Sequence, residues 1–169
     1  MSHEKKIMYI CRKAGIMANR MTNDPKVIKK IIDKCEACYV GMVDLEGHPY
    51  VLPFNFGYED EIIYLHSAQI GKKIDILKAN PQVCIVFSTD HQLFHRHEPV
   101  ACSYGMKYRS VLASGQVAFI DDYDEKVRVL NIIMRKYAGK DFDYNPPAVN
   151  NVCVYKVEPT SIEGKESGY

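Results

Sequence analysis

The sequence lacks any apolar run near the roughly 20 residues that a membrane-spanning helix needs. Its basic N-terminal segment also lacks the apolar core and small-residue cleavage site of a secretory signal. The formal net charge is only +1, so no overall field favours nucleic acid or an anionic membrane. We therefore expect a cytoplasmic protein with no nucleic-acid or membrane partner, in which any anion site is local.

The sequence also has no internal repeat, no low-complexity linker and no GxGxxG pattern of a dinucleotide-binding turn. Its 169 residues, 47% hydrophobic and 25% charged, fit one domain with a single core. Weak periodicity over residues 1–22 predicts an N-terminal arm, and residues 23–169 are expected to form the domain.

The six cysteines do not indicate a disulfide framework, because the chain is not small, secreted or loop-rich. Cys35 and Cys38 have the spacing of a zinc-binding pair, but no second pair stands at a matching distance. Cys102 and the histidines of segment 91–97 could complete such a site only by accident of folding. We expect reduced thiols and no metal.

Apolar periodicity predicts three helices. A capping residue followed by proline at 24–25 predicts a helix start, and apolar residues on one face continue to Cys35. A short helix is predicted over residues 71–79. A third helix is expected to begin near 121–122, with Gly139 as its C-cap.

Short apolar runs separated by polar turns predict strands. These runs are 38–44, 49–57, 62–67, 82–88, 107–120 and 151–158. Short turns join the first three into an antiparallel meander, and Gly115 predicts a bulge or a bend. The polar stretch 89–106 is expected to be an exposed loop. The order of elements predicts a mainly β fold, a six-stranded antiparallel barrel with helices outside.

The segment 64–73 carries the strongest chemical pattern. A strand ends at the hydroxyl of Ser67, and Gly71 precedes Lys72 and Lys73 at a helix start. Free backbone N–H groups and the helix dipole favour an anion there, and the lysines add charge-assisted donors. The pattern suits a terminal phosphate; the alternative is a solvated lysine pair on a surface helix.

Two further strand segments contain groups that need an explanation. Pro53 removes a ladder donor in mid-strand, which indicates an edge or bulge whose freed backbone groups could bond a flat polar ring. A plain barrel edge is the alternative. Arg109 lies in an otherwise apolar strand, where an unpaired charge would be costly. Its partner could be a phosphate, or a carboxylate such as Asp44 or Glu61.

Five segments match a known pattern in order and spacing. They are CEACYVGMVD, PYVLPFNFGYED, IYLHSAQIGKKIDILKANPQVCIVF, ACSYGMKYRSVLASGQV and the helix end IMRKYAG. Over residues 24–158 the chain resembles the pyridoxamine-phosphate-oxidase-like split-barrel family, with the nitroimidazole-resistance (Nim-type) flavoproteins as the nearest branch. The resemblance implies a homodimer with two FMN molecules at the subunit interface. It also implies an FMN-dependent reductase that passes electrons to a small-molecule acceptor, with NAD(P)H as a transient donor.

The resemblance implies contacts to the flavin ring. Val51, Leu52 and Pro53 would lie along the ring edge, and His66 and Ser67 beside the flavin or its ribityl chain. Nim-type proteins place a histidine near the flavin as a candidate catalytic or ligand-contacting group, and His66 fits that position. The alternative for His66 is a histidine that only caps the strand and satisfies a backbone carbonyl.

The resemblance also implies that Lys72 and Lys73 bind the phosphate, where the oxidase branch carries an arginine–lysine pair. Point-charge binding is thereby retained without the bidentate grip of arginine. Ser110 would close the site from the long fifth strand, and Asn55 and Arg109 complete the expected cofactor-binding set. The substrate motif of the true oxidases is not recognisable near the C-terminus, so that activity is not expected.

A second class of function stays open, namely a non-enzymatic flavin- or haem-binding protein used for storage or sensing. A histidine of the segment QLFHRHEPV would suffice as an axial haem ligand, although a solvated loop is the plainer interpretation. Turnover with an acceptor after reduction by a nicotinamide donor would separate an enzyme from a binding protein.

Overall fold

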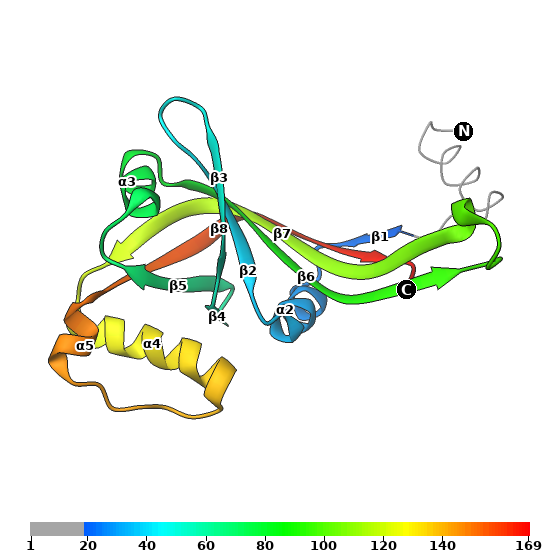
Figure 1. Ribbon diagram of the computed structural model, residues 1–169. Coiled ribbons are helices and arrows are strands. Elements are labelled where there is room, and N and C mark those ends of the chain that lie inside the picture. The colour runs from blue at the N-terminus through cyan, green and yellow to red at the C-terminus, as the bar shows by residue number, and fades with distance from the viewer. Residues whose placement is uncertain (1–18) are drawn as a thin grey trace.

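The β-rich pattern folds as one curled antiparallel sheet with helices at its ends and along one side (Figure 1). The computed structural model describes residues 19–169. The strands are β1 (Asn19–Thr22), β2 (Cys38–Val43), β3 (Pro49–Phe54), β4 (Phe56–Glu59), β5 (Ile62–Ala68), β6 (Gln82–His95), β7 (Tyr104–Ile120) and β8 (Val152–Ser167). The helices are α2 (Pro25–Lys34), α3 (Lys72–Ala79), α4 (Tyr123–Ala138) and α5 (Pro146–Asn150), with a 3₁₀ turn η1 (Ala101–Ser103). The predicted mainly β class is confirmed.

The strand order explains why the sheet curls into a barrel. The order is β3-β2-β6-β7-β8-β5-β4, with β1 added to β8. β3 and β4 lie at opposite ends of this path, yet only Asn55 separates them in the chain. The two ends of the sheet must therefore meet. Across the interior, the ring of Phe54 packs edge-on against Tyr155 of β8, with 6.3 Å between the ring centroids.

The described structure has eight strands where six were expected. The expected strand 49–57 is interrupted at the Asn55 corner and becomes β3 and β4. Residues 19–22, the end of the expected N-terminal arm, pair with β8 as β1. Residues 1–18 lie outside the described part of the chain, so the boundary between arm and domain stays a prediction.

The predicted loop over residues 89–106 is wrong for most of its length. β6 continues to His95 and β7 begins at Tyr104, and the two strands extend together beyond the barrel (Figure 1). Both sides of this hairpin arm contact solvent, so its sequence has no apolar alternation to reveal it. The last strand is also longer than predicted, because β8 runs to Ser167.

The helix predictions are confirmed, with their caps. The Asp24 side chain accepts a hydrogen bond from the Lys26 N–H at the start of α2, and Asp122 accepts one from the Glu125 N–H in α4. Gly139 ends α4 in the left-handed conformation, with φ of 70°. Within residues 19–169, no helix combines the length and the apolar content that crossing a membrane requires.

Apolar side chains form two layers. The barrel interior holds one core, to which α2 adds Ile28 and Ile32 and α3 adds Ile74 and Leu77. A second core lies outside the barrel, where α4 and α5 cover β5 and the start of β8. One outer side of the barrel is thus covered by helices.

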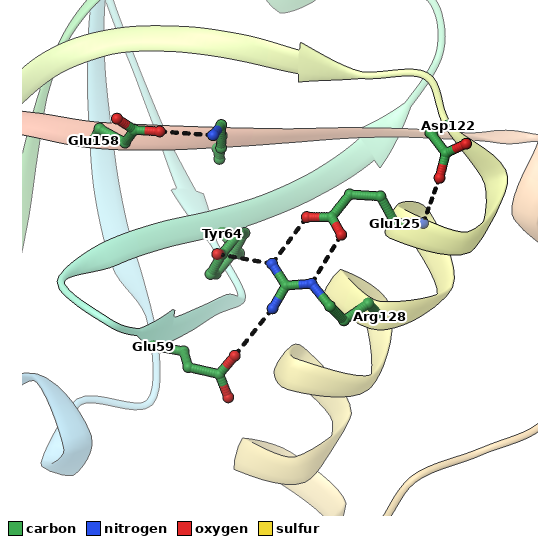
Figure 2. A network of polar contacts seen from close by, with 7 residues as sticks. Glu59, Tyr64, Asp122, Glu125, Arg128 and Glu158 are labelled. Carbon is green, nitrogen blue, oxygen red and sulfur yellow. Dashed lines mark hydrogen bonds and ion pairs between the residues drawn. The ribbon is translucent and has the colours of Figure 1, made fainter.

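An arginine of α4 ties the covering helix to the sheet (Figure 2). The Arg128 guanidinium forms two 2.8 Å contacts with the Glu125 carboxylate, and it donates to the Tyr64 hydroxyl at 3.0 Å and to Glu59 at 3.1 Å. These partners lie in α4, β5 and β4. The network therefore joins three elements at the edge of the outer core.

Candidate functional site

The opposite outer side of the barrel exposes apolar side chains. In antiparallel strands, directly paired residues point to the same face of the sheet. Pro53 pairs with Tyr39, Tyr39 with Val86, and Val86 with Leu112. By the same alternation, this face also carries Val51, Cys84 and Ser110. We call these seven residues the bare face, because Val51, Tyr39 and Leu112 remain 59%, 51% and 48% exposed.

The edge strand β3 bounds the bare face. β3 pairs with β2 alone among the described strands, so its outward N–H and C=O groups have no ladder partner. The edge position predicted for Pro53 is confirmed, and this proline removes a donor where none is needed. Free backbone groups beside Val51 and Pro53 can bond the edge of a flat polar ring.

Two other predicted residues lie differently along this chain segment. The side chain of Leu52 packs against the interior core, so only its backbone can reach a ligand on the bare face. Asn55 is exposed at the corner between β3 and β4. The Leu52 side chain is therefore not part of the bare face, and Asn55 follows directly after the edge strand that bounds this face.

The start of α3 lies next to β3. Gly71 precedes the helix with φ of 116° and gives it no side-chain cap, which leaves the first backbone N–H groups available to an anion. The Lys72 ammonium lies 5.2 Å from the ring centroid of Tyr50, the neighbour of Val51 in β3. The Lys73 ammonium acts electrostatically on the Cys153 thiol, where it opposes the rise in pKa that burial causes.

Ser67 and Tyr155 meet at the interior side of β5. The Ser67 hydroxyl donates to the Ala68 carbonyl at 2.9 Å. The Tyr155 hydroxyl is fully buried and has no hydrogen-bond partner within residues 19–169. Burial raises its pKa, and the nearby Ser67 hydroxyl opposes that rise. A buried hydroxyl without a partner is uncommon and indicates a place where another polar group can enter.

His66 and Ser67 point to opposite faces of β5. His66 pairs with Val154, which belongs to the outer core under α4 and α5. Its Nδ1 is buried and has no hydrogen-bond partner in the described chain, and burial lowers the pKa of the imidazole. Nδ1 therefore satisfies no backbone carbonyl within residues 19–169, and the choice between a catalytic and a strand-capping His66 stays a prediction. His66 also does not share the bare face with Val51.

Arg109 has the carboxylate partners that its strand position required. Its guanidinium contacts Asp90 and Glu166, each at 2.7 Å, and stacks on the Tyr169 ring at 3.8 Å. These partners differ from the Asp44 and Glu61 suggested by sequence. Asp90 lies in a stretch expected to be a loop, and Glu166 lies beyond the expected last strand. The role of Arg109 in cofactor binding stays a prediction.

One group of possible metal ligands was missed in the sequence. Asp44, Glu46 and His48 of the β2–β3 turn bring their ligand atoms within 4.8 Å of one another. Asp44 already accepts a hydrogen bond from the His48 N–H, which lowers the pKa of its carboxyl. Cys35 and Cys38 are buried, and burial raises the pKa of Cys38 to about 12, which favours the protonated thiol.

Comparison with known proteins agrees with this architecture. A model of the family described as Pyridoxamine 5'-phosphate oxidase matches residues 24–166. Among solved structures, the chain is similar to a candidate 5-nitroimidazole antibiotic resistance protein from Bacteroides thetaiotaomicron, with 46% identity over 89% of each chain and a TM-score of 0.80. No curated protein matches the chain.

Two more distant structures share the fold. A flavocytochrome from Azotobacter vinelandii is 20% identical over 86% of this chain and 68% of its own, with a TM-score of 0.74. An FAD and heme binding protein from Mycobacterium smegmatis is 15% identical over 88% of this chain and 74% of its own, with a TM-score of 0.77. At these identities the likeness is one of fold alone.

Proposed function

Because the chain belongs to the pyridoxamine 5'-phosphate oxidase family, we propose that it is a cytoplasmic FMN-binding reductase of small oxidised compounds such as nitroaromatics. The description of the 46% identical relative as a candidate 5-nitroimidazole resistance protein supports this substrate class. The flavin-binding descriptions of two relatives of the same fold support a flavin cofactor.

The observation that carries the proposal is the proximity of the edge strand β3 to the start of α3. The 5.2 Å contact between Lys72 and the Tyr50 ring brings the two together. A flat ring can bond the free backbone beside Val51 and Pro53, while a phosphate takes the uncapped N–H groups after Gly71. A flavin held there supplies the electron transfer to an acceptor.

Each side chain of the site then has a binding task. Lys72 and Lys73 supply the positive charge that neutralises the phosphate. The Ser67 hydroxyl, beside the unpartnered Tyr155 hydroxyl, can turn to the ribityl chain. His66 keeps a neutral imidazole at neutral pH, because burial lowers its pKa. Its side chain points away from Ser67 and the bare face, and it is kept as the candidate proton-transfer residue for the test below.

The bare face supports a homodimer. Contiguous exposed apolar side chains are uncommon on monomers of this size and mark interaction surfaces. A second copy related by twofold symmetry would cover Tyr39, Val51 and Leu112 together with one side of the flavin ring. In the absence of a GxGxxG turn, NAD(P)H would dock transiently at the exposed flavin.

The cofactor is tested on purified protein. We expect a yellow protein with flavin absorption that releases FMN, rather than FAD, on denaturation and chromatography. Release of FAD would show that the cofactor is FAD instead of FMN and would still support a flavin site. A spectrum with haem alone, or no flavin uptake after reconstitution, would overturn the proposal.

The reaction is tested with two variants of one residue. If His66 transfers a proton, His66→Ala and His66→Gln should both keep FMN and its reduction by NAD(P)H, and both should lose turnover with a nitro or quinone acceptor. If His66 only orients the flavin, glutamine should restore much of the loss through its own hydrogen bonds. Unchanged turnover in both variants would remove His66 from the chemistry.

A further inference from the structure

A pocket lies on the other side of α3 from the Lys72–Tyr50 contact. It has a volume of about 390 Å³, within the range of small-molecule sites. The pocket opens where α3, the end of β7, the start of β8 and α4 come together. Ile74, Phe119 and Val152 form its apolar walls.

Two of the three charged side chains that line this pocket are cationic, and the Gln69 amide also lines it. Lys78 of α3 and Lys126 of α4 line it from two sides, against the single carboxylate of Asp121. Within residues 19–169, neither lysine forms an ion pair with a carboxylate. Lys126 donates to the Val152 carbonyl at 3.3 Å, which leaves its other ammonium hydrogens free.

The thiol of Cys153 also lines the pocket and responds to these charges. Burial raises its pKa, and the ammonium groups of Lys126, Lys78 and Lys73 oppose the rise, while Asp121 adds to it. Three cations and one anion therefore influence the Cys153 thiol. Apolar walls strengthen such a field, because less water screens it.

We propose that this pocket binds a small organic anion with an apolar body, of the aromatic carboxylate class. The carboxylate would lie between Lys78 and Lys126, and the ring against Phe119 and Val152. Lys72, the predicted ring-edge residues and the bare face do not line this pocket. The pocket borders the proposed flavin site, because Cys153 pairs with Ser67 of β5 and Lys73 acts on its thiol, but the residues that line it have no task in the proposed flavin binding.

The first test measures binding of benzoate, with neutral benzamide as the matched probe, by calorimetry on the purified full-length protein. Benzoate should bind at least tenfold more tightly than benzamide. The double variant Lys78→Gln/Lys126→Gln should remove this preference. The control variant Lys26→Gln/Lys30→Gln, which removes two exposed lysines of α2, should keep it. Equal binding of both probes, or a preference that survives in the Lys78/Lys126 variant, overturns the proposal.

The second test uses Cys153 as a reporter in the unaltered protein. Its thiolate displaces iodide from anionic iodoacetate or neutral iodoacetamide, and mass spectrometry counts the adducts at each cysteine. The iodoacetate-to-iodoacetamide rate ratio should be several-fold higher at Cys153 than at exposed Cys102, and benzoate should protect Cys153. Equal ratios at the two cysteines contradict the proposal. Flavin content, measured in parallel, keeps this result separate from the test of the proposed function.

Discussion

The two outer sides of the barrel are both formed by antiparallel strands of one sheet, but one side is buried under helices and the other is exposed. On the covered side, α4 and α5 bury Val129, Ile133 and Val154 to 2% exposure or less. On the bare face, Tyr39, Val51 and Leu112 stay about half exposed. The covered side therefore holds the fold together within one chain. The bare face keeps apolar surface and free edge backbone for something outside the chain.

The largest difference in unfolding free energy should appear when one leucine on each side is replaced by alanine. Leu130 of α4 is 8% exposed and Leu112 is 48% exposed. Leu130→Ala should lower the free energy of unfolding by about 2 to 5 kcal/mol through cavity formation. Leu112→Ala should lower it by less than about 1 kcal/mol at monomeric concentration. Urea unfolding measures both, and equal losses would refute the distinction.

The second largest effect is expected on FMN affinity, from the lysines at the start of α3. Replacing Lys72 and Lys73 together by alanine should weaken FMN binding by on the order of 3 kcal/mol, since two charge-assisted contacts are lost. Riboflavin has no phosphate and should bind nearly as before. Fluorescence titration of both flavins gives the comparison. Equal weakening would show that the lysines do not recognise the phosphate.

A matched tyrosine pair tests assembly. Tyr39→Asp places a charge on the bare face, and Tyr123→Asp places one at the exposed start of α4. If a second copy covers the bare face, Tyr39→Asp should weaken dimerisation at least about tenfold, or about 1.4 kcal/mol, because a carboxylate would be buried unpaired. Tyr123→Asp should not. Light scattering across a dilution series measures this, and a parent protein that is monomeric at micromolar concentration would disprove the dimer.

A smaller effect is expected from the ion network of the covered side. Arg128→Lys keeps the charge and loses the fork that contacts Glu125, Glu59 and Tyr64, which should cost about 1 kcal/mol of unfolding free energy. Lys29→Gln breaks an isolated exposed pair with Asp33 and should cost only a few tenths. If thermal unfolding gives the same loss of stability for both variants, the Arg128 network contributes no more than an isolated surface pair.

The smallest effect is the pH dependence due to His66. Burial lowers its folded pKa below 6.5, so the unfolded chain binds more protons between the two values. The His66 contribution to stability is therefore present above about pH 6.5 and declines as the pH falls toward the folded pKa. His66→Gln should flatten the stability profile between about pH 7 and pH 5. NMR titration that gives a pKa above 6.5 would contradict this sign.

The sequence predicted the elements whose local signals agree with their packing. The caps Asp24, Asp122 and Gly139 are visible in the sequence. The irregularity predicted at Gly115 is confirmed, because the register between β7 and β8 shifts between Ser114 and Gly115, although the extra residue belongs to β8. The Asn55 corner was missed, since the apolar run around it is continuous. A corner at a single residue arises because the strands before and after it pair with different strands far away in the sequence, and a local pattern does not show such pairing.

The candidate site was predictable only in part. Strand alternation in the sequence places Val51 and Pro53 on one face of their strand, and Ser110 on one face of another strand. Only the register of β2, β6 and β7 shows that all three lie on the same face of the sheet. The same alternation separates His66 from Ser67, which the family resemblance had grouped. The partners of Arg109 could not be predicted, because Asp90 and Glu166 lie 19 and 57 residues away in strand extensions without apolar pattern.

The pairing of β1 with β8 has a consequence for how the chain folds. Asn19 pairs with Ser167, and β8 also pairs with β5 and β7. Such long sequence separations give a high contact order and slow folding. During synthesis, β5 and β7 must wait with open edges until β8 leaves the ribosome. The nascent chain is then most vulnerable to aggregation just before its last strand arrives, so a chaperone that shields those edges would raise its yield most at that stage.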